Sequence, residues 1–534
     1  MTNFIGFLKK YWSYLILAPS LVYFSFYYPW YFQIIFLLFS AAIIGLYFHL
    51  RKSDVLEIPL WPILGIAFAI LLFSRIYPFF LSDWPLGYDT GIYKWHFEEA
   101  WRIFPSFSTG LYPGIFLITD LLYAIGFKSW AVLNGWYVFF DLLIPVAIFL
   151  YCRREFGVKV AAISAFLFAV SLAQAQAYSF ILYKNIVALS VMFFAFLLIE
   201  KRSYWAIPLA AYLVFLQPPD FVIFGLTIAI YFILNLRDRE KRRFILISTI
   251  IASILGFAAF YIINPQALKE GLNILINFKD VGEVAQKEGL FMSAGNYLGL
   301  SILYIPFALF AFAYLIKNRK FNLAFSYFLV VFVFIVFKLI FYKRFLIEFD
   351  IAVITLAGLG VYLIFRKFYM SVYGKITLVL LAAAMISVNI YRTLDYKPFI
   401  SNAELKDIKW VAEHTEPESV AMATTSIYSP WILGFSNRPT IAPGMFDMNR
   451  WNFEEWMRFW TGDINDHLAL WQKYGDMAGR PVYLFYGLQE PWPDFAKFPI
   501  YKRVSNFVWR FNMAETLKSA QNLNDEKNKK SVKK

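Results

Sequence analysis

The chain has 534 residues, of which 60% are hydrophobic, 21% are aromatic and only 16% are charged. This composition lies outside the range of soluble domains and excludes an ordinary water-soluble enzyme over most of the length. The formal net charge of +14 would suit a nucleic acid partner, but most basic residues fall in short loops between apolar runs or in the last residues of the chain, so we expect no nucleic acid binding.

Up to about residue 391, long apolar runs alternate with short charged loops, which is typical of a polytopic membrane protein. Runs long enough to cross roughly 30 Å of hydrocarbon occur at about thirteen places. We therefore predict an all-α membrane domain with spans at 12–28, 31–48, 58–74, 130–151, 158–174, 186–200, 204–217, 219–236, 243–263, 297–316, 321–341, 346–365 and 373–391.

The basic residues of the short loops predict the orientation, because Lys and Arg are retained on the cytoplasmic side. One set of loops carries them: Lys9 and Lys10, Arg51 and Lys52, Arg153 and Arg154, Lys201 and Arg202, Arg237 to Arg243, Lys317 to Lys320, and Arg366 and Lys367. All lie on one side if the apolar stretch 111–127 is a surface helix rather than a span. The amino terminus is then cytoplasmic, and residues 75–129, 264–296 and everything after 391 lie outside.

The remainder of the chain is predicted to fold in water. We divide the sequence into a transmembrane domain, 1–394, a small α/β extracytoplasmic domain, 395–520, and a disordered basic tail, 521–534. Cys152 is the single cysteine, so the outer domain folds without a disulfide. We expect most of its tryptophans to build its core: Trp410, Trp431, Trp451, Trp456, Trp460, Trp471, Trp492 and Trp509.

Several motifs are missing, and their absence narrows the function. The first apolar run lacks a clear cleavage site, so we do not expect it to be a signal peptide. The sequence has no Walker loop and no HExxH motif, which disfavours ATP-driven transport and zinc proteolysis.

Polar side chains with chemical capability concentrate in residues 82–99 of the first outer loop. If the stretch after Gly87 is helical, Asp89, Tyr93 and His96 share one face, at spacings of four and three residues. A carboxylate in that place can act as a general base or bind a cation. The structural alternative is that Asp89 merely caps a surface helix.

Positive charge on the predicted outer side forms a second concentration. Lys338, Lys343 and Arg344 lie at the outer end of a late span, against the charge rule. Arg at a membrane surface suits a phosphate, because its fork binds in a bidentate manner; the alternative is snorkelling to lipid headgroups. Lys184 and Asn185 make a third polar point, in a short outer turn.

In order and sidedness these elements resemble the GT-C superfamily of integral membrane glycosyltransferases, which take sugars from lipid phosphate donors. Gly-Tyr-Asp-Thr at 87–90 with Tyr93 resembles the acidic motif of the first outer loop, where the aspartate serves as base or metal ligand. Leu-Tyr-Pro-Gly-Ile-Phe at 111–116 resembles the juxtamembrane helix that follows. Arg344, with Phe345, resembles the late Arg-Phe segment of oligosaccharyltransferase catalytic subunits, whose arginine faces the donor phosphate.

The carboxy-terminal domain shows both likeness and departure. Residues 408–420 are similar to the start of the soluble domain of oligosaccharyltransferases, but Thr-Thr-Ser-Ile-Tyr-Ser-Pro-Trp at 424–431 stands where that family carries Trp-Trp-Asp-Tyr-Gly. Recognition of an Asn-x-Ser/Thr acceptor is therefore not expected. Lys184 and Asn185 stand where the family places acidic metal ligands, which argues against a tightly held metal. A divalent cation, Mg²⁺ or Mn²⁺, with Asp89 as a ligand stays open.

The resemblance implies a glycosyltransferase that moves a sugar from a polyprenyl phosphate or pyrophosphate to a glycan, lipid or protein acceptor at the outer face of the cell membrane, with inversion. It implies Asp89 as base, and Arg344, Lys343 and Lys184 at the donor phosphate. Further candidates to line the site are Tyr88, Tyr93, His96, Asn185 and Glu288. Candidates to bind the acceptor are Tyr428 and Arg438. Glu283 and Glu288 have a solvated surface as their alternative role. The rival functions are a transporter or lipid-linked glycan flippase and an inactive scaffold.

Overall fold

The fold is described from a computed structural model, for residues 60–100, 114–236, 238–265, 268–269, 272, 291–368, 372–443, 451–472, 480–489 and 495–511. The predicted spans 12–28 and 31–48 and the tail 521–534 lie outside these residues. The described chain forms two compact units, each treated by itself. Unit 1 comprises residues up to Asp83, Phe107–Phe127 and Asn134–Lys397, and unit 2 comprises Trp84–Ser106, Lys128–Leu133 and the chain from Pro398.

Unit 1 is built of helices. In chain order they are α3 (Leu60–Ile76), the 3₁₀ turn Tyr77–Leu81, α5 (Gly114–Ala124), α7 (Tyr137–Glu155), α8 (Val158–Val170), α9 (Leu172–Ser179), α10 (Tyr183–Glu200), α11 (Ala206–Leu216), α12 (Pro218–Leu234), α13 (Arg239–Ile263), α16 (Ala294–Ser301), α17 (Ile305–Lys317), α18 (Leu323–Val336), α19 (Leu346–Phe368) and α20 (Val372–Leu394).

Five of the described helical stretches are long and apolar enough to cross a membrane, or up to seven if each of two bent helix pairs is one span. The five are Leu60–Leu81, Ser129–Glu155, Tyr183–Glu200, Arg239–Ile263 and Leu346–Phe365, and the bent pairs are α8 with α9 and α16 with α17. Shorter apolar helices coincide with the predicted spans 204–217, 219–236, 321–341 and 373–391. A polytopic membrane domain is thus confirmed, while the number of thirteen spans stays a prediction. The stretch predicted to lie on the surface, 111–127, contains the short helix α5.

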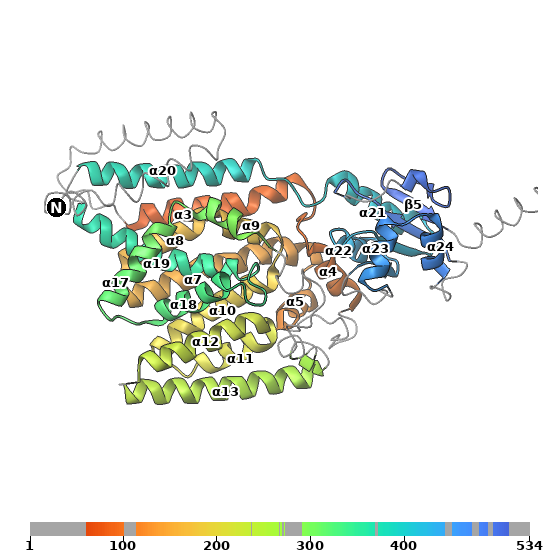
Figure 1. Ribbon diagram of the computed structural model, residues 1–534. Helices are drawn as coiled ribbons and strands as arrows, with labels where there is room; N and C mark the ends of the chain where they lie inside the picture. Colours follow the sequence, from red (N-terminus) through yellow and green to blue (C-terminus); the bar gives the residue numbers. More distant parts are fainter. Residues whose placement is uncertain are drawn as a thin grey trace, which may run out of the picture. The chain divides into compact units, whose positions relative to one another are not determined.

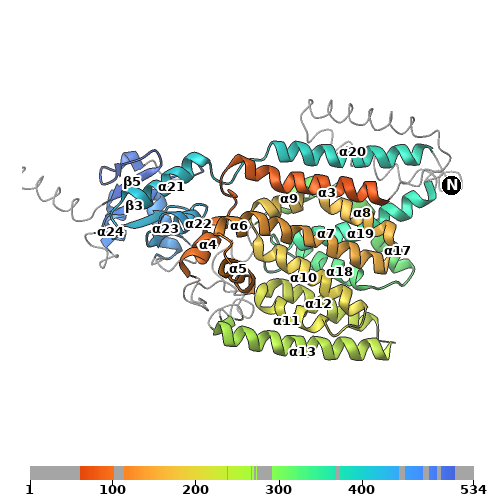
Figure 2. The same cartoon turned by 180° about the vertical axis from the view of Figure 1, so that it is seen from behind.

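The helices of unit 1 run side by side, with α13 at one edge and α3 and α20 at the other (Figures 1 and 2). Helix α19 is central, since 89% of its apolar window is buried inside the protein, against 28% for α13. Helix α13 instead carries exposed apolar side chains, among them Ile254 and Ile262. After its charged start at 239–243, the helix exposes apolar side chains, as expected of a membrane-spanning helix that faces lipid.

One carboxylate joins the two helix bends. Helices α8 and α9 meet at 51°, and α16 and α17 meet at 90°. Asp350, buried in α19, accepts hydrogen bonds from side chains at both breaks: from Ser171 (2.7 Å), Gln174 (3.0 Å), Tyr297 (3.3 Å), Ser301 (3.4 Å) and Tyr304 (2.5 Å). The bends therefore depend on a single acidic residue of a third helix.

Unit 2 contains a mixed five-stranded sheet with the strand order β2-β1-β3-β5-β4. Strand β1 is parallel to β2 and β3, with Ala421 opposite Thr440 and Val420 opposite Val482, and β5 is antiparallel to β3 and β4. Its elements are α4 (Thr90–Trp95), a π-helical turn (His96–Ala100), α6 (Ser129–Ala131), which continues into a second π-helical turn (Val132–Trp136), α21 (Asn402–His414), β1 (Val420–Ala423), α22 (Ser429–Phe435), β2 (Thr440–Ile441), α23 (Phe453–Thr461), α24 (Ile464–Gln472), β3 (Val482–Phe485), the 3₁₀ turn Phe495–Lys497, β4 (Lys502–Arg503) and β5 (Val508–Phe511).

Alternate residues of the strands supply two cores. Val420, Met422 and Leu484 pack on one face with Trp456 and Trp471 of α23 and α24. Ala421, Ala423 and Phe485 pack on the other face with residues of α21 and α22. This alternation follows from the two-residue period of a strand and makes unit 2 a helix–sheet–helix arrangement, as the predicted small α/β domain required. Trp431, Trp451, Trp456 and Trp471 are buried, as predicted; Trp492 lies outside the described residues.

Residues 84–100 of the first loop group with the chain from Pro398 in unit 2. This grouping depends on contacts between residues more than 300 positions apart. The domain bounds 1–394, 395–520 and 521–534 stay a prediction.

Candidate functional site

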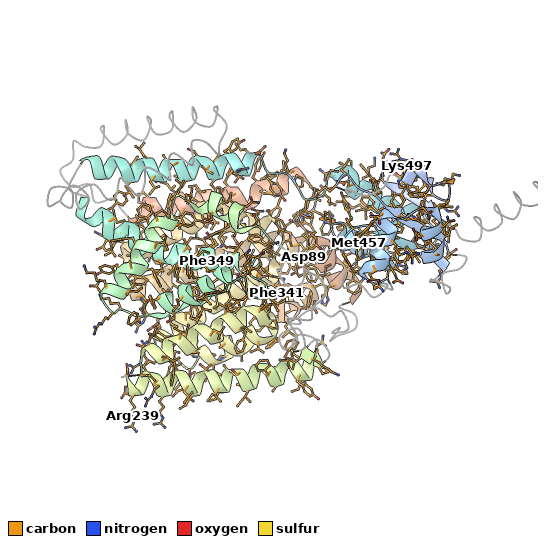
Figure 3. The ribbon with its side chains drawn as sticks, in the orientation of Figure 1. Asp89, Arg239, Phe341, Phe349, Met457 and Lys497 are labelled. Atoms are coloured by element: carbon orange, nitrogen blue, oxygen red, sulfur yellow. The ribbon has the colours of Figure 1, made fainter. Side chains whose placement is uncertain are left out.

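Asp89 stands at the N-cap position of α4, but its side chain makes no capping hydrogen bond to the helix. The residue is half-buried, and Figure 3 labels its side chain just before α4. Capping alone was the structural alternative for this aspartate. The observed geometry shows no side-chain cap, and the role of Asp89 as a general base stays a prediction.

The loop that carries Asp89 is fixed by close packing of α4 on α22. A Cβ atom on Gly91 would lie 1.9 Å from the backbone oxygen of Pro430, and one on Gly434 would lie 2.2 Å from the oxygen of Gly91. Only glycine permits backbones to approach this closely. The indole Nε1 of Trp431 also donates to the oxygen of Gly87 at 3.1 Å. The loop is therefore held from both ends of the Gly87–Gly91 stretch.

Of the other predicted residues of this loop, Tyr93 and His96 are buried within unit 2 and Tyr88 is half-buried. Tyr88 donates its hydroxyl proton to the backbone oxygen of Ser426 at 3.0 Å, and burial, together with the charge of Asp89, raises its pKa above the ordinary value. Tyr93 and His96 are 2% and 1% exposed. Of the predicted face, only Asp89 is accessible enough to meet a substrate, while Tyr93 and His96 pack inside.

In unit 1, Arg344 lies directly before α19, and Asn185 lies in the first turn of α10. The guanidinium donates from Nε and Nη2 to Oδ1 of Asn185, at 3.1 and 2.6 Å. No hydrogen-bond partner for Nη1 occurs among the described residues. The structure thus brings together two predicted residues that are 159 positions apart.

Two buried carboxyl groups that sequence reasoning missed stand behind this pair. Nδ2 of Asn185 donates to Oδ1 of Asp220 at 3.4 Å, and Glu348 lies in α19, four residues after Arg344. Both acids are fully buried. They fall inside the predicted spans 219–236 and 346–365, and neither was selected as a candidate. A carboxylate within an apolar run is itself the signal that could have found them, because such residues are costly and usually functional.

The turns that carry the predicted phosphate contacts hold strained backbone. Ile181, Lys338 and Phe341 have φ angles of 60°, 47° and 59°, in the left-handed region that bulky residues rarely adopt. Ile181 precedes Lys184, and Phe341, labelled in Figure 3, precedes Lys343. Strain of this kind persists where the surrounding structure over-determines the backbone, and it clusters at functional sites. Lys184 and Lys343 are both half-buried.

The two predicted acceptor residues make contacts internal to unit 2. Tyr428 is fully buried and donates its hydroxyl proton to Glu404 at 2.7 Å. Arg438 donates to the backbone oxygens of Ala412 and Thr415, at 3.2 and 2.8 Å, and so satisfies the last turn of α21. These contacts give both residues a place in the fold of unit 2, and acceptor binding by them stays a prediction.

No three His, Cys, Asp or Glu side chains gather to hold a metal within the part of the chain that the structure describes. Glu288 and Glu283 lie outside that part. A divalent cation, Mg²⁺ or Mn²⁺, with Asp89 as a ligand stays a prediction.

Further charged side chains are buried in the helices of unit 1. Arg75 of α3 pairs with Asp141 of α7 at 2.8 Å, and both are at most 1% exposed. The guanidinium of Arg75 also lies 5.1 Å from the ring of Tyr178. Arg75 and Asp141 form an ion pair, and Asp350 is satisfied by hydrogen bonds from neutral side chains, as buried charges require.

No protein-family model matches the sequence, and no curated protein matches it. Solved structures match at low identity. The oligosaccharyltransferase of Archaeoglobus fulgidus in the apo form is 14% identical, covers 80% of this chain and 70% of that chain, and has a TM-score of 0.62. ArnT of Cupriavidus metallidurans in the apo state is 14% identical, covers 85% and 98%, and has a TM-score of 0.57.

Two ligand complexes belong to the same set of matches. AglB of Archaeoglobus fulgidus was solved with an inhibitory peptide and a dolichol-phosphate, and matches at 14% identity over 80% of this chain and 69% of that chain, with a TM-score of 0.58. ArnT was also solved with undecaprenyl phosphate. These likenesses confirm the predicted resemblance to GT-C glycosyltransferases at the level of the fold.

Proposed function

We propose that this chain is a membrane glycosyltransferase that takes a sugar from a polyprenyl phosphate or pyrophosphate donor. The single observation that carries the proposal is the Arg344–Asn185 pair at the start of α19 and α10, in which Nη1 of a fixed guanidinium has no hydrogen-bond partner among the described residues. A guanidinium in this state suits a phosphate oxygen. The fold supports the same function, since its matches include structures with dolichol-phosphate and undecaprenyl phosphate.

The proposed reaction is a single displacement. The acceptor hydroxyl oxygen attacks the anomeric carbon, the bond from that carbon to the phosphate oxygen breaks, and the electron pair leaves with the phosphate. Asp89 takes the proton of the hydroxyl as general base. Attack opposite to the leaving group inverts the anomeric configuration. No step is written through a metal ion.

Positive charge assists the departure of the lipid phosphate. Arg344 binds an oxygen on which negative charge develops, and Lys184 and Lys343 add charge from the neighbouring turns. Fixed donors of this kind are worth about 10²–10³ in rate when they act in a site shielded from water. The proposed acceptor is a glycan, a lipid or a protein. The transfer assay described next identifies the sugar.

The test is transfer of radiolabelled sugar from a panel of polyprenyl-linked donors by the purified full chain. We expect Asp89→Asn to lower transfer about 10²–10⁴-fold and Arg344→Ala to lower it about 10²-fold or more. Asp83→Asn is the matched control, because Asp83 is an exposed carboxylate of the same loop. A parallel reaction with chelator tests the metal directly.

The outcomes distinguish three candidate functions: glycosyltransferase, lipid-linked glycan flippase and inactive scaffold. Loss of transfer in Asp89→Asn with normal transfer in Asp83→Asn supports the proposal. Equal transfer by all variants removes Asp89 from the chemistry. If no donor gives transfer but labelled lipid crosses a vesicle bilayer, the chain is a lipid-linked glycan flippase; if neither occurs, the scaffold function is favoured.

A further inference from the structure

The structure assigns Asn185 and Asp220 as positioning residues for Arg344: Asp220 orients the amide of Asn185, whose oxygen fixes two nitrogens of the guanidinium and leaves Nη1 for a phosphate oxygen. The residues come from three segments of unit 1, namely α10, α12 and the turn before α19. This inference rests on the proposed function for the identity of the ligand only. The positioning itself is a property of the protein without ligand.

We call the hydrogen-bonded series Asp220–Asn185–Arg344 the relay. Its order follows from the chemistry of the three side chains. An amide can present either its oxygen or its NH₂ group to a neighbour. A carboxylate accepts hydrogen bonds, so Asp220 draws the NH₂ group of Asn185 toward itself, and the observed bond of 3.4 Å is of this kind. The amide oxygen then faces Arg344, where it accepts from Nε at 3.1 Å and from Nη2 at 2.6 Å.

The two ends of the relay differ in exposure. Asn185 and Asp220 are fully buried, whereas Arg344 is half-buried. The guanidinium is thus anchored from the protein interior by a fully buried amide. A planar guanidinium bound through one edge keeps a fixed plane, and its remaining nitrogen points in one direction only.

The test measures how tightly Arg344 is held, without any assumed substrate. The full chain in lipid nanodiscs is treated with phenylglyoxal, which modifies arginine, and the rate at Arg344 is followed by mass spectrometry of its peptide. We expect Asn185→Ala to raise this rate about tenfold and Asp220→Asn about threefold, because hydrogen bonds to a charged group are lost or weakened. Ser190→Ala, on the same helix as Asn185 with a hydroxyl that donates to Val187, is the matched control and leaves the rate unchanged.

A second readout separates this inference from the proposed function. Undecaprenyl phosphate is titrated into the same nanodiscs, and we expect about tenfold weaker binding in Asn185→Ala. If Arg344 is labelled at the wild-type rate in both Asn185→Ala and Asp220→Asn, the positioning is refuted. If Asn185→Ala does not fold, the isosteric variant Asp220→Asn alone provides this test. If labelling changes as expected but the wild type binds no undecaprenyl phosphate, the positioning stands and the donor proposal falls.

Discussion

In unit 1 the carboxylate of Asp350 accepts hydrogen bonds from five side chains, whereas in unit 2 the carboxylates of Glu404 and Glu455 complete capping boxes at the starts of α21 and α23. The first arrangement ties several helices together. In the second, Glu455 serves the start of one helix, and Glu404 also accepts from the hydroxyl of Tyr428 at 2.7 Å. A chain in lipid must satisfy a buried acid with its own side chains, while a domain in water needs only to satisfy the free ends of its helices. Polar substitutions should therefore cost more in unit 1.

The largest effect is expected from Asp350→Leu. The change removes the acceptor shared by five buried side chains at the two helix bends, of which Gln174 and Tyr304 keep a second acceptor. We therefore expect a loss of about 5 kcal/mol in the free energy of unfolding of unit 1. The measurement is unfolding in mixed micelles by titration with SDS, followed by circular dichroism. A loss below about 1 kcal/mol would show that the bends do not depend on this carboxylate. Thr355→Val is the control, since the hydroxyl of Thr355 in the same helix donates only to Ile351.

Arg75→Met is expected to cost about 4 kcal/mol, because it leaves Asp141 charged and buried without its partner. The double variant Arg75→Met with Asp141→Leu should recover most of that loss, since an apolar pair of similar volume replaces a desolvated ion pair. The same SDS titration provides the measurement. A double variant no more stable than Arg75→Met would mean that the pair, rather than the unpaired charge, determines the stability.

The pH dependence of unit 2 should come from His467. Its ring is buried between Phe459 and Phe498, at centroid distances of 4.8 and 4.5 Å, and burial lowers its pKa to about 4. The unfolded chain takes up the proton near pH 6.5, so stability is fully present above that pH and falls as the pH drops toward 4. Between about pH 7.5 and about pH 5 we expect a loss of about 2 kcal/mol.

Tryptophan fluorescence during urea unfolding, repeated across this pH range, measures the loss. His467→Gln should remove the dependence, whereas His414→Gln should retain it, because His414 is exposed. A slope that survives in His467→Gln would assign the dependence to another group.

The smallest effect is expected from Asn452→Ala, which removes the cap of α23. The side chain of Asn452 accepts from the backbone of Glu455 at 2.9 Å, and loss of such a cap costs about 1 kcal/mol. Urea unfolding at neutral pH gives the value. A cost as large as that of Asp350→Leu would remove the contrast between the two units.

Where a long apolar run forms a helix of unit 1, the sequence predicted the position of that helix well. The predicted spans 58–74 and 346–365 match α3 and α19 within a few residues, and so does 243–263 with α13. Periodicity and length are local properties. The bends at Ser171 and after Ser301 were not predicted, because they depend on Asp350, which lies far away in the chain.

The candidate site was predictable only in part. Asp89, Asn185 and Arg344 were selected from their residue types and positions, and two of the three prove to be in contact. Asp220 was missed, since a single acid at the start of an apolar run resembles a helix-start residue, and its partner Glu348 belongs to another helix. Tyr93 and His96 share a helical face with Asp89 but pack inside, because spacing places residues on a face and does not say what covers it.

The close approach of Gly91 and Gly434 has a consequence for the biosynthesis of this protein. The segment that holds Asp89 leaves the ribosome some 340 residues before the helix on which it packs, so almost the whole membrane domain is made and inserted while that segment lacks its support. A chain that stops before α22 would expose an unsupported loop to proteases and carry no ordered Asp89. Completion of the carboxy-terminal domain thus decides when the first loop acquires its structure.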